Sequence, residues 1–199
     1  NNEYITKLID DYKYIEGEYF NERKHWLNDD YVKFIRYSEE VISKNGNGIL
    51  AFINNNGFLG NPTFRCMRYH LLKTFDSIYI INLHGDSNKH ETCPDGSKDE
   101  NVFDIKQGVS INIFVKKQGA KNTMPLVKYC DFWGLREYKC QNLIKSVAKF
   151  SEIRPTEPFF LFQNVDLTNS EIYTTHYISI NELFDVFTTG IVTARDDLV

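Results

Sequence analysis

Long apolar runs are missing from this chain. The longest, at residues 77–83, is far shorter than the roughly 18–20 residues that a membrane span needs. The first residues, NNEYITKLIDD, are polar and acidic, which is unlike a signal peptide or a transit peptide. We therefore expect no membrane partner.

Paired cysteines are also missing. The chain has four cysteines and no C-x-x-C pair, and they are scattered at Cys66, Cys93, Cys130 and Cys140. Dispersed cysteines in a chain of this size indicate reduced thiols, so we expect a cytoplasmic protein.

Recognisable metal-binding spacings are absent as well. His84, His90 and Cys93 match no closed zinc site, and no fourth ligand is evident. Asp95, Asp99 and Asp104 occupy one loop, but they lack the regular spacing of a calcium loop. We expect no metal site and interpret these carboxylates as a solvated acidic loop.

The chain has no excess of positive charge. Its formal net charge of −4 argues against a dedicated nucleic-acid-binding module with a pervasive basic face. A local basic strip is still compatible with DNA binding, because only the groups that face phosphate contribute. Basic residues concentrate in two such places: Arg65, Arg68, His70 and Lys73 on the outward side of one expected helix, and Lys106, Lys116 and Lys117 around one expected strand.

A signature of nucleotide binding is missing. No G-x-G lies between a strand and a helix, since Gly46 and Gly48 follow a helix and precede a strand. The histidines have no recognisable nucleophile or carboxylate partners either: His25, His70, His84, His90 and His176. We therefore assign no catalytic and no cofactor-binding residue. A small-molecule Rossmann enzyme is disfavoured, because its nucleotide-binding half should be present.

Alternating helix and strand signals are present. Asp29 or Asp30 caps a helix that Gly46 ends, with Tyr31, Phe34, Ile35, Val41 and Ile42 on its expected core face. Residues 48–53 then form an apolar strand typical of the centre of a parallel sheet. Asn61-Pro62 starts a second helix, with Phe64, Met67, Leu71, Leu72 and Phe75 toward the core, and residues 77–83 form the next strand. This order predicts a parallel α/β sheet.

A polar loop and a returning strand follow. The loop, residues 84–108, is longer than a compact domain normally carries without a functional reason. The β-branched run at 109–117 is expected to return antiparallel at the sheet edge. Residues 127–135 indicate a strand and a turn, and 137–150 indicate a helix. We place a domain boundary between residues 122 and 123.

The sequence DENVFDIKQGVSINIFVKK (residues 99–117), with the strand before it, resembles the last hairpin of DNA adenine-N6 methyltransferases with a gamma-like motif order. GILAFINNNGFLGNPTFRCMR (48–68) and GIVTARDDLV (190–199) resemble the fused type ISP and type II-like restriction–modification enzymes. The resemblance implies an α/β fold: the carboxyl-terminal half of a Rossmann-like S-adenosylmethionine-dependent methyltransferase sheet with an antiparallel last strand, plus a smaller mixed region.

The same resemblance implies a fragment that starts after the catalytic Asn-Pro-Pro-Tyr motif. Residues 1–122 would be the carboxyl half of the catalytic domain, and 123–199 the linker and the start of the target-recognition region. The parent protein would use S-adenosylmethionine and act on double-stranded DNA. Because the cofactor loop and the catalytic motif are not in this chain, we expect the isolated chain to be inactive.

Phe103 is the residue to which the resemblance gives a specific role. In that family the target base is rotated out of the duplex and held between aromatic faces. Phe103 stands six residues before the last strand, where one of these aromatics is expected, and such stacking gives roughly 1–3 kcal/mol per base. The alternative is that its ring packs under its own loop.

Three basic residues are candidates for contact with the DNA backbone. Lys106 is the best of them because it shares the loop of Phe103, and phosphate contacts position a duplex without reading its sequence. Arg65 and Arg68 are the other two. For these two the alternative is an ordinary solvated helix face.

A second hypothesis comes from another functional class. The alternative is a degenerate methyltransferase half that serves as a non-catalytic DNA- or protein-binding scaffold. Under either hypothesis, a sheet without its first strands exposes the edge at residues 49–53. Exposed strand edges recruit partners, so we expect self-association through that edge.

Overall fold

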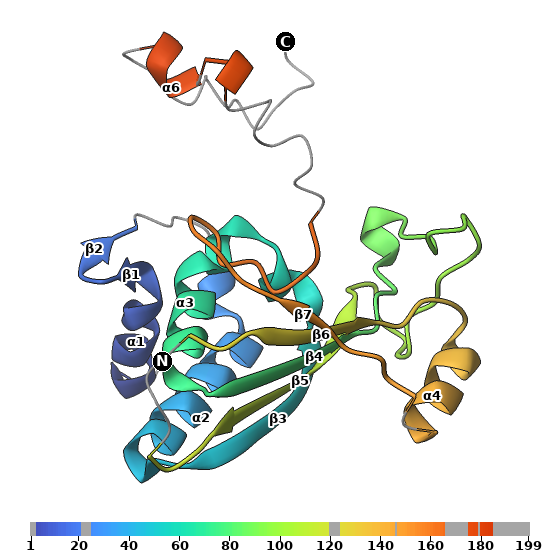
Figure 1. Cartoon of the computed structure of the whole chain (residues 1–199), viewed down its shortest axis with the longest axis horizontal. Coiled ribbons are helices and arrows are strands. Elements are labelled where there is room, and N and C mark those ends of the chain that lie inside the picture. Colours follow the sequence, from blue (N-terminus) through green and yellow to red (C-terminus); the bar gives the residue numbers. More distant parts are fainter. Residues whose placement is uncertain are drawn as a thin grey trace. The chain divides into compact units, whose positions relative to one another are not determined.

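A mixed five-stranded sheet forms the centre of the fold, with strand order β3-β5-β4-β6-β7 (Figure 1). The strands are β3 (Gly48–Asn55), β4 (Ser77–Asn82), β5 (Val109–Lys116), β6 (Val127–Asp131) and β7 (Ser151–Ile153). A separate antiparallel pair consists of β1 (Tyr14–Ile15) and β2 (Glu18–Tyr19). This α/β architecture is compatible with a partial Rossmann-like methyltransferase sheet and confirms the expected fold class.

The computed structural model describes residues 3–20, 25–119, 124–145, 147–165, 175–178 and 180–184. Two compact units divide between residues 164 and 165. The second unit contributes the short helix α6 (Ile180–Leu183). The GIVTARDDLV run at 190–199 lies outside the described residues.

Four longer helices belong to the first unit. They are α1 (Glu3–Asp10), α2 (Asp30–Asn45), α3 (Arg65–Thr74) and α4 (Arg136–Ile144). Single 3₁₀ turns lie between the helices and strands: η1 (Asp11–Lys13), η2 (His25–Asn28), η3 (Asn56–Leu59), η4 (Pro62–Phe64) and η5 (Ser87–Lys89).

Helix α2 begins and ends where the sequence indicates. It follows Asp29 and stops at Gly46, whose φ of 76° is left-handed and whose amide donates to the Ile42 carbonyl. Its buried face differs in part from the expected one. Phe34 and Val41, predicted in the core, are 61% and 40% exposed. The Phe34 ring lies beside Phe52 of the edge strand β3, with centroids 6.4 Å apart, so it packs at the rim of the apolar cluster and not inside it.

Helix α3 supplies the core face that its sequence predicts. The Asn61 side chain accepts a hydrogen bond from the Thr63 amide at 3.0 Å, and Pro62 occupies the first position of the turn that leads into the helix. The predicted core side chains are all buried and belong to one apolar cluster with residues of β4 and β5: Phe64, Met67, Leu71, Leu72 and Phe75.

Strand β5 lies antiparallel between β3 and β4. Its antiparallel direction confirms the prediction, but its predicted place at the sheet edge is wrong. The edge is occupied by β3, which was predicted as a central parallel strand. The difference arises because β5 pairs on both sides, and its own apolar pattern does not specify how many neighbours it meets.

The predicted boundary between residues 122 and 123 does not separate two compact units. Strand β6, beyond that boundary, pairs in parallel with β4 in the same sheet, with Ile78 opposite Val127 and Ile80 opposite Tyr129. The division falls between residues 164 and 165 instead. The assignment of 1–122 and 123–199 to catalytic and recognition regions stays a prediction.

Among the described residues, α2 and α3 pack on one face of the sheet (Figure 1). On β5, Phe114 faces these helices and is fully buried, whereas its neighbours Ile113 and Val115 are half-buried on the opposite face. Ile49 and Ile53 of β3 share that opposite face and are 68% and 47% exposed. The edge strand is therefore both unpaired on its outer side and apolar.

We predict that the free edge of β3 causes self-association at high concentration. Ile49→Lys should reduce it, because a charged side chain on an edge strand opposes pairing with another chain. Light scattering measures the effect: the mass of the wild-type chain should rise with concentration, while that of the variant stays monomeric. Ile144→Lys, at a residue 83% exposed on α4, is the matched control. A wild-type chain that stays monomeric would refute the prediction.

Candidate functional site

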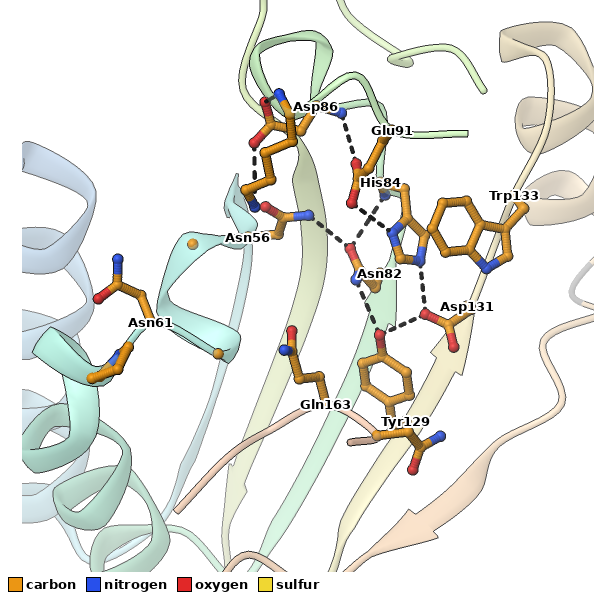
Figure 2. A pocket seen from close by; sticks show the side chains of 15 residues that line it. Asn56, Asn61, Asn82, His84, Asp86, Glu91, Tyr129, Asp131, Trp133 and Gln163 are labelled. Atoms are coloured by element: carbon orange, nitrogen blue, oxygen red, sulfur yellow. Dashed lines mark hydrogen bonds and ion pairs between the residues drawn. The ribbon is translucent and has the colours of Figure 1, made fainter. Parts of the chain in front are cut away.

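The carboxyl ends of three strands meet at one edge of the sheet. Strands β3 and β4 are both antiparallel to β5 and hence parallel to each other, and β6 is parallel to β4. In open α/β sheets ligands bind at the carboxyl ends of the strands. Here these ends border a cavity of about 580 Å³, which we call the strand-end cavity (Figure 2). Its lining residues are Asn56, Gly57, Gly60, Asn61, Pro62, Asn82, His84, Asp86, Lys89, Glu91, Tyr129, Asp131, Trp133, Gln163 and Asn164.

A continuous chain of hydrogen bonds crosses the strand-end cavity from β3 to β6 (Figure 2). The Asn56 amide donates to Asn82 Oδ1 at 3.0 Å, and the Asn82 amide donates to the Tyr129 hydroxyl at 3.0 Å. That hydroxyl donates in turn to Asp131 Oδ1 at 2.5 Å. Each of these side chains is therefore hydrogen-bonded to the next one in the chain of bonds, which fixes their positions before any ligand binds.

His84 joins this network at the end of β4. Its side chain is buried, with Nε2 at 2.7 Å from Asp131 Oδ1 and Nδ1 at 3.4 Å from Glu91 Oε1. The ring stacks on Trp133, with centroids 3.3 Å apart and planes 14° from parallel. With a carboxylate at each nitrogen, the imidazole is placed to carry a proton on both.

Burial and hydrogen bonding act in opposite directions on this group. Burial lowers the pKa of His84, but the hydrogen bonds to Asp131 and Glu91 outweigh it, so the pKa lies above its ordinary value. For Glu91, burial raises the pKa, and the hydrogen bonds from His84 and from the Asp86 amide reverse that effect and lower it. The pair is thus stabilised in its charged form.

The lining chemistry suits a polar organic group rather than a phosphate. Asp86, Glu91 and Asp131 are carboxylates, whereas Lys89 is the one lining lysine and is already paired with Asp86 at 3.4 Å. Carboxylates and amides accept and donate hydrogen bonds, but a surplus of negative charge repels anions. In the part of the chain that the structure describes, no three His, Cys, Asp or Glu side chains are grouped to hold a metal ion.

Phe103 lies in the loop between β4 and β5, apart from the residues that line the strand-end cavity. It is 45% exposed, and its backbone amide donates to Asn101 Oδ1 at 2.9 Å. The strands on either side of this loop are hydrogen-bonded neighbours, with Ile78 opposite Phe114. Lys106 in the same loop is exposed. The stacking and phosphate roles stay predictions.

Arg68 lies in the interior, so its predicted place on the outward side of the helix is wrong. Its side chain is fully buried, and its guanidinium donates at 2.6–3.0 Å to four backbone carbonyls, those of Phe58, Asn61, Phe159 and Phe160. Burial, together with the charge of Arg65, lowers the pKa of Arg68 to about 9, which leaves it charged at neutral pH. It joins α3 to residues 159–160 and has no free face for a phosphate.

Arg65 is half-buried rather than fully solvated. Its guanidinium lies over the rings of Phe20 and Phe159, at 5.4 Å from each centroid, and its Nε donates to the Pro62 carbonyl at 3.2 Å. These cation–π contacts account for its position without DNA. A phosphate contact by Arg65 stays a prediction.

The partners of His84 were not predicted from the sequence. The structure shows that they are Asp131 and Glu91. One available signal was position: Asn56, Asn82 and Asp131 each stand at the end of an expected strand. Strands that run parallel bring such residues to the same edge, even 47 residues apart, as His84 and Asp131 are.

No protein-family model and no curated protein sequence matches the chain. Solved structures do. The chain is 26% identical to the ATP-dependent type ISP restriction–modification enzyme LlaBIII bound to DNA, with a TM-score of 0.66 over 85% of this chain and 12% of that one. A DrdV–DNA complex gives 27% identity and 0.66, over 85% of this chain and 16% of that one. A nuclease-deletion mutant of the type ISP enzyme LlaGI with a DNA substrate mimic shares the fold, at 23% identity and 0.67, over 86% and 16%.

The fold thus gives the class first: an α/β fold with a mixed sheet that is compatible with part of a Rossmann-like methyltransferase sheet. The likeness to type ISP enzymes then supports a relationship with restriction–modification proteins. The chain spans only 12–16% of the length of the chains it matches. Among the helices of the described residues, none combines the length and apolarity of a bilayer span.

We predict a pH-dependent contribution of His84 to stability. Because folding raises the pKa of His84, its protonated ring stabilises the fold fully below about pH 6.5. This contribution is lost as pH rises through the pKa of His84 in the folded protein. The lowered pKa of Glu91 keeps its contribution above about pH 4.3. The difference in melting temperature between wild type and His84→Gln should therefore be largest near pH 5–6 and narrow by about pH 9. A constant difference across this range would contradict the account, and His90→Gln, at an exposed histidine of the same loop, is the control.

We also predict that Arg68 is structural. Arg68→Met leaves four carbonyls without this buried donor, which should lower the free energy of unfolding by about 3 kcal/mol or more. Arg65→Met loses cation–π contacts and one exposed hydrogen bond, and it should cost about 1 kcal/mol or less. Chemical denaturation of the two variants measures both values, and equal losses would refute the assignment.

Proposed function

We propose that this chain is part of an S-adenosylmethionine-dependent DNA adenine-N6 methyltransferase within a restriction–modification protein. Its contribution is one wall of the pocket that holds an extruded adenine. The observation that carries the proposal is the antiparallel insertion of β5 between β3 and β4. The long loop that joins β4 to β5 bears the half-exposed Phe103.

The solved structures to which the chain is similar add support. LlaBIII and DrdV are described in complex with DNA, and they share about a quarter of this chain's residues over most of its length. Double-stranded DNA is therefore the partner that we propose for the parent protein. Lys106, exposed near Phe103 in the loop, is the proposed phosphate contact.

The residues in this chain do not fit the cofactor by themselves. No G-x-G follows a strand and precedes a helix, and no Asn-Pro-Pro-Tyr sequence is present. Methyl transfer would need both of these elements from outside the chain. The role of this chain is to present an aromatic face and to position DNA.

We predict that Phe103 binds an unpaired adenine by stacking. Phe103→Ala should weaken binding to an oligonucleotide with an unpaired adenine by roughly tenfold, because a base–aromatic stack gives about 1–3 kcal/mol. Binding to ordinary duplex should change little, and Phe103→Trp should retain affinity. Fluorescence anisotropy measures these affinities. Phe34→Ala, at another exposed phenylalanine, is the matched control.

Two outcomes would count against the proposal. Equal affinities of wild type and Phe103→Ala for the unpaired adenine would remove the stacking role. Incorporation of labelled methyl groups into DNA by the isolated chain would show that the catalytic elements are present after all. Equal binding of duplex and of the unpaired-adenine oligonucleotide, with neither dependent on Phe103, would favour the non-catalytic scaffold.

A further inference from the structure

Lys139 of α4 is buried against the loop that carries Phe103. Its side chain is fully buried, and its ammonium donates to the Leu83 carbonyl at 2.7 Å and to the Glu100 carbonyl at 2.6 Å. It also forms an ion pair with Asp99 Oδ1 at 2.7 Å, in which both side chains are 0% exposed. One cation thus joins the end of β4, the loop and α4.

Arg136, one turn earlier on α4, binds the loop on both sides of Phe103. Its Nε donates to the Asn101 carbonyl at 2.9 Å, and its Nη2 pairs with Asp104 Oδ1 at 2.6 Å. Its backbone amide donates to Glu100 Oε2 at 3.2 Å. Phe103 lies between two residues that the same guanidinium holds.

Asn101 connects this clamp to the base of the loop. Its Oδ1 accepts the Phe103 amide at 2.9 Å, and its Nδ2 donates to the carbonyls of Gly85 at 3.1 Å and Gln107 at 2.7 Å. Gly85 has a left-handed φ of 81°, and a Cβ there would lie 2.4 Å from the Asn101 Cα. The approach of these segments therefore requires glycine.

The buried ion pair is a weak source of stability. Among the described residues, Asp99 Oδ2 is a buried oxygen without a hydrogen-bond partner. Burying two charges costs desolvation that their attraction only partly repays, so apolar side chains of similar volume are often as stable. Such a pair does fix the local geometry, because moving either group away would leave a buried charge without its partner.

We propose that Arg136 and Lys139 are positioning residues that hold Phe103 in the orientation needed to stack on an unpaired nucleobase. This inference rests on the proposed function for the identity of the stacked group. Neither residue touches the base. Through them, the place of α4 sets the place of the aromatic ring.

The test separates positioning from stability. Arg136→Gln removes the contacts on both sides of Phe103 at a side chain that is 43% exposed, so the fold should persist. Asp99→Leu combined with Lys139→Met replaces the buried pair by apolar groups, but it also leaves the Leu83 and Glu100 carbonyls and the Gly134 amide without their partners, so its melting temperature should fall below that of wild type. Lys145→Met, at an exposed lysine that ends α4, is the control.

Two measurements are made on each variant of the full chain. Hydrogen exchange of the Phe103 amide should become roughly tenfold faster or more in Arg136→Gln and in the double variant, while exchange in β4 is unchanged. Affinity for an oligonucleotide with an unpaired adenine should fall roughly tenfold. In the Phe103→Ala background the same substitutions should cause no further loss of affinity. A merely structural role would instead lower the affinity in both backgrounds.

Each outcome decides the inference. Unchanged exchange and unchanged affinity in Arg136→Gln would overturn it, as would additive losses in the Phe103→Ala background. If Phe103→Ala itself does not affect affinity, the proposed function fails, and the exchange of the Phe103 amide still decides whether Arg136 and Lys139 position the loop. Should the double variant not fold, Arg136→Gln provides the answer alone.

Discussion

The antiparallel pairing of β5 on both of its sides is the constraint from which the site follows. Eight residue pairs join it to β3 and six join it to β4, so both neighbours must run in the same direction. Parallel neighbours end at the same edge, which brings Asn56 and Asn82 together there. Residues 84–108 join β4 to β5, and the exposed aromatic ring of Phe103 lies in that span.

The end of β4 is where two polar systems meet. Leu83 gives its carbonyl to Lys139, and the next residue, His84, gives its ring to Asp131 and Glu91. One system contains an ion pair with 0% exposure, whereas the other faces the strand-end cavity. Because consecutive residues serve both, the segment after β4 has little freedom to shift, and the cavity and the loop keep a fixed relation.

Local signals in the sequence predicted the elements, and long-range pairing lay beyond them. Gly46 and Asn61 mark helix ends through their own backbone and side-chain chemistry, which needs no knowledge of the rest of the fold. The position of β5 inside the sheet depends on which strands it meets, and apolar alternation does not encode that choice. Arg68 was misplaced for a related reason: periodicity assigns cations to the surface, but carbonyls from 91–92 residues away surround it. His84 and Asp131 likewise meet only after the sheet forms.

The ties made by Asn101 divide the long loop into two parts with different tolerance. Residues 85 and 107 are joined through its amide, and Ser87 donates its backbone amide to the Lys106 carbonyl. Beyond these closures, the tip has its own turn, with the Gly96 amide bonded to Cys93 and Thr92 bridged to Lys98. The turn at the tip is exposed and closed by its own bonds, so its length can vary without breaking the ties made by Asn101. Extra residues or a fluorescent tag near position 95 would be accommodated there without altering the aromatic ring below it.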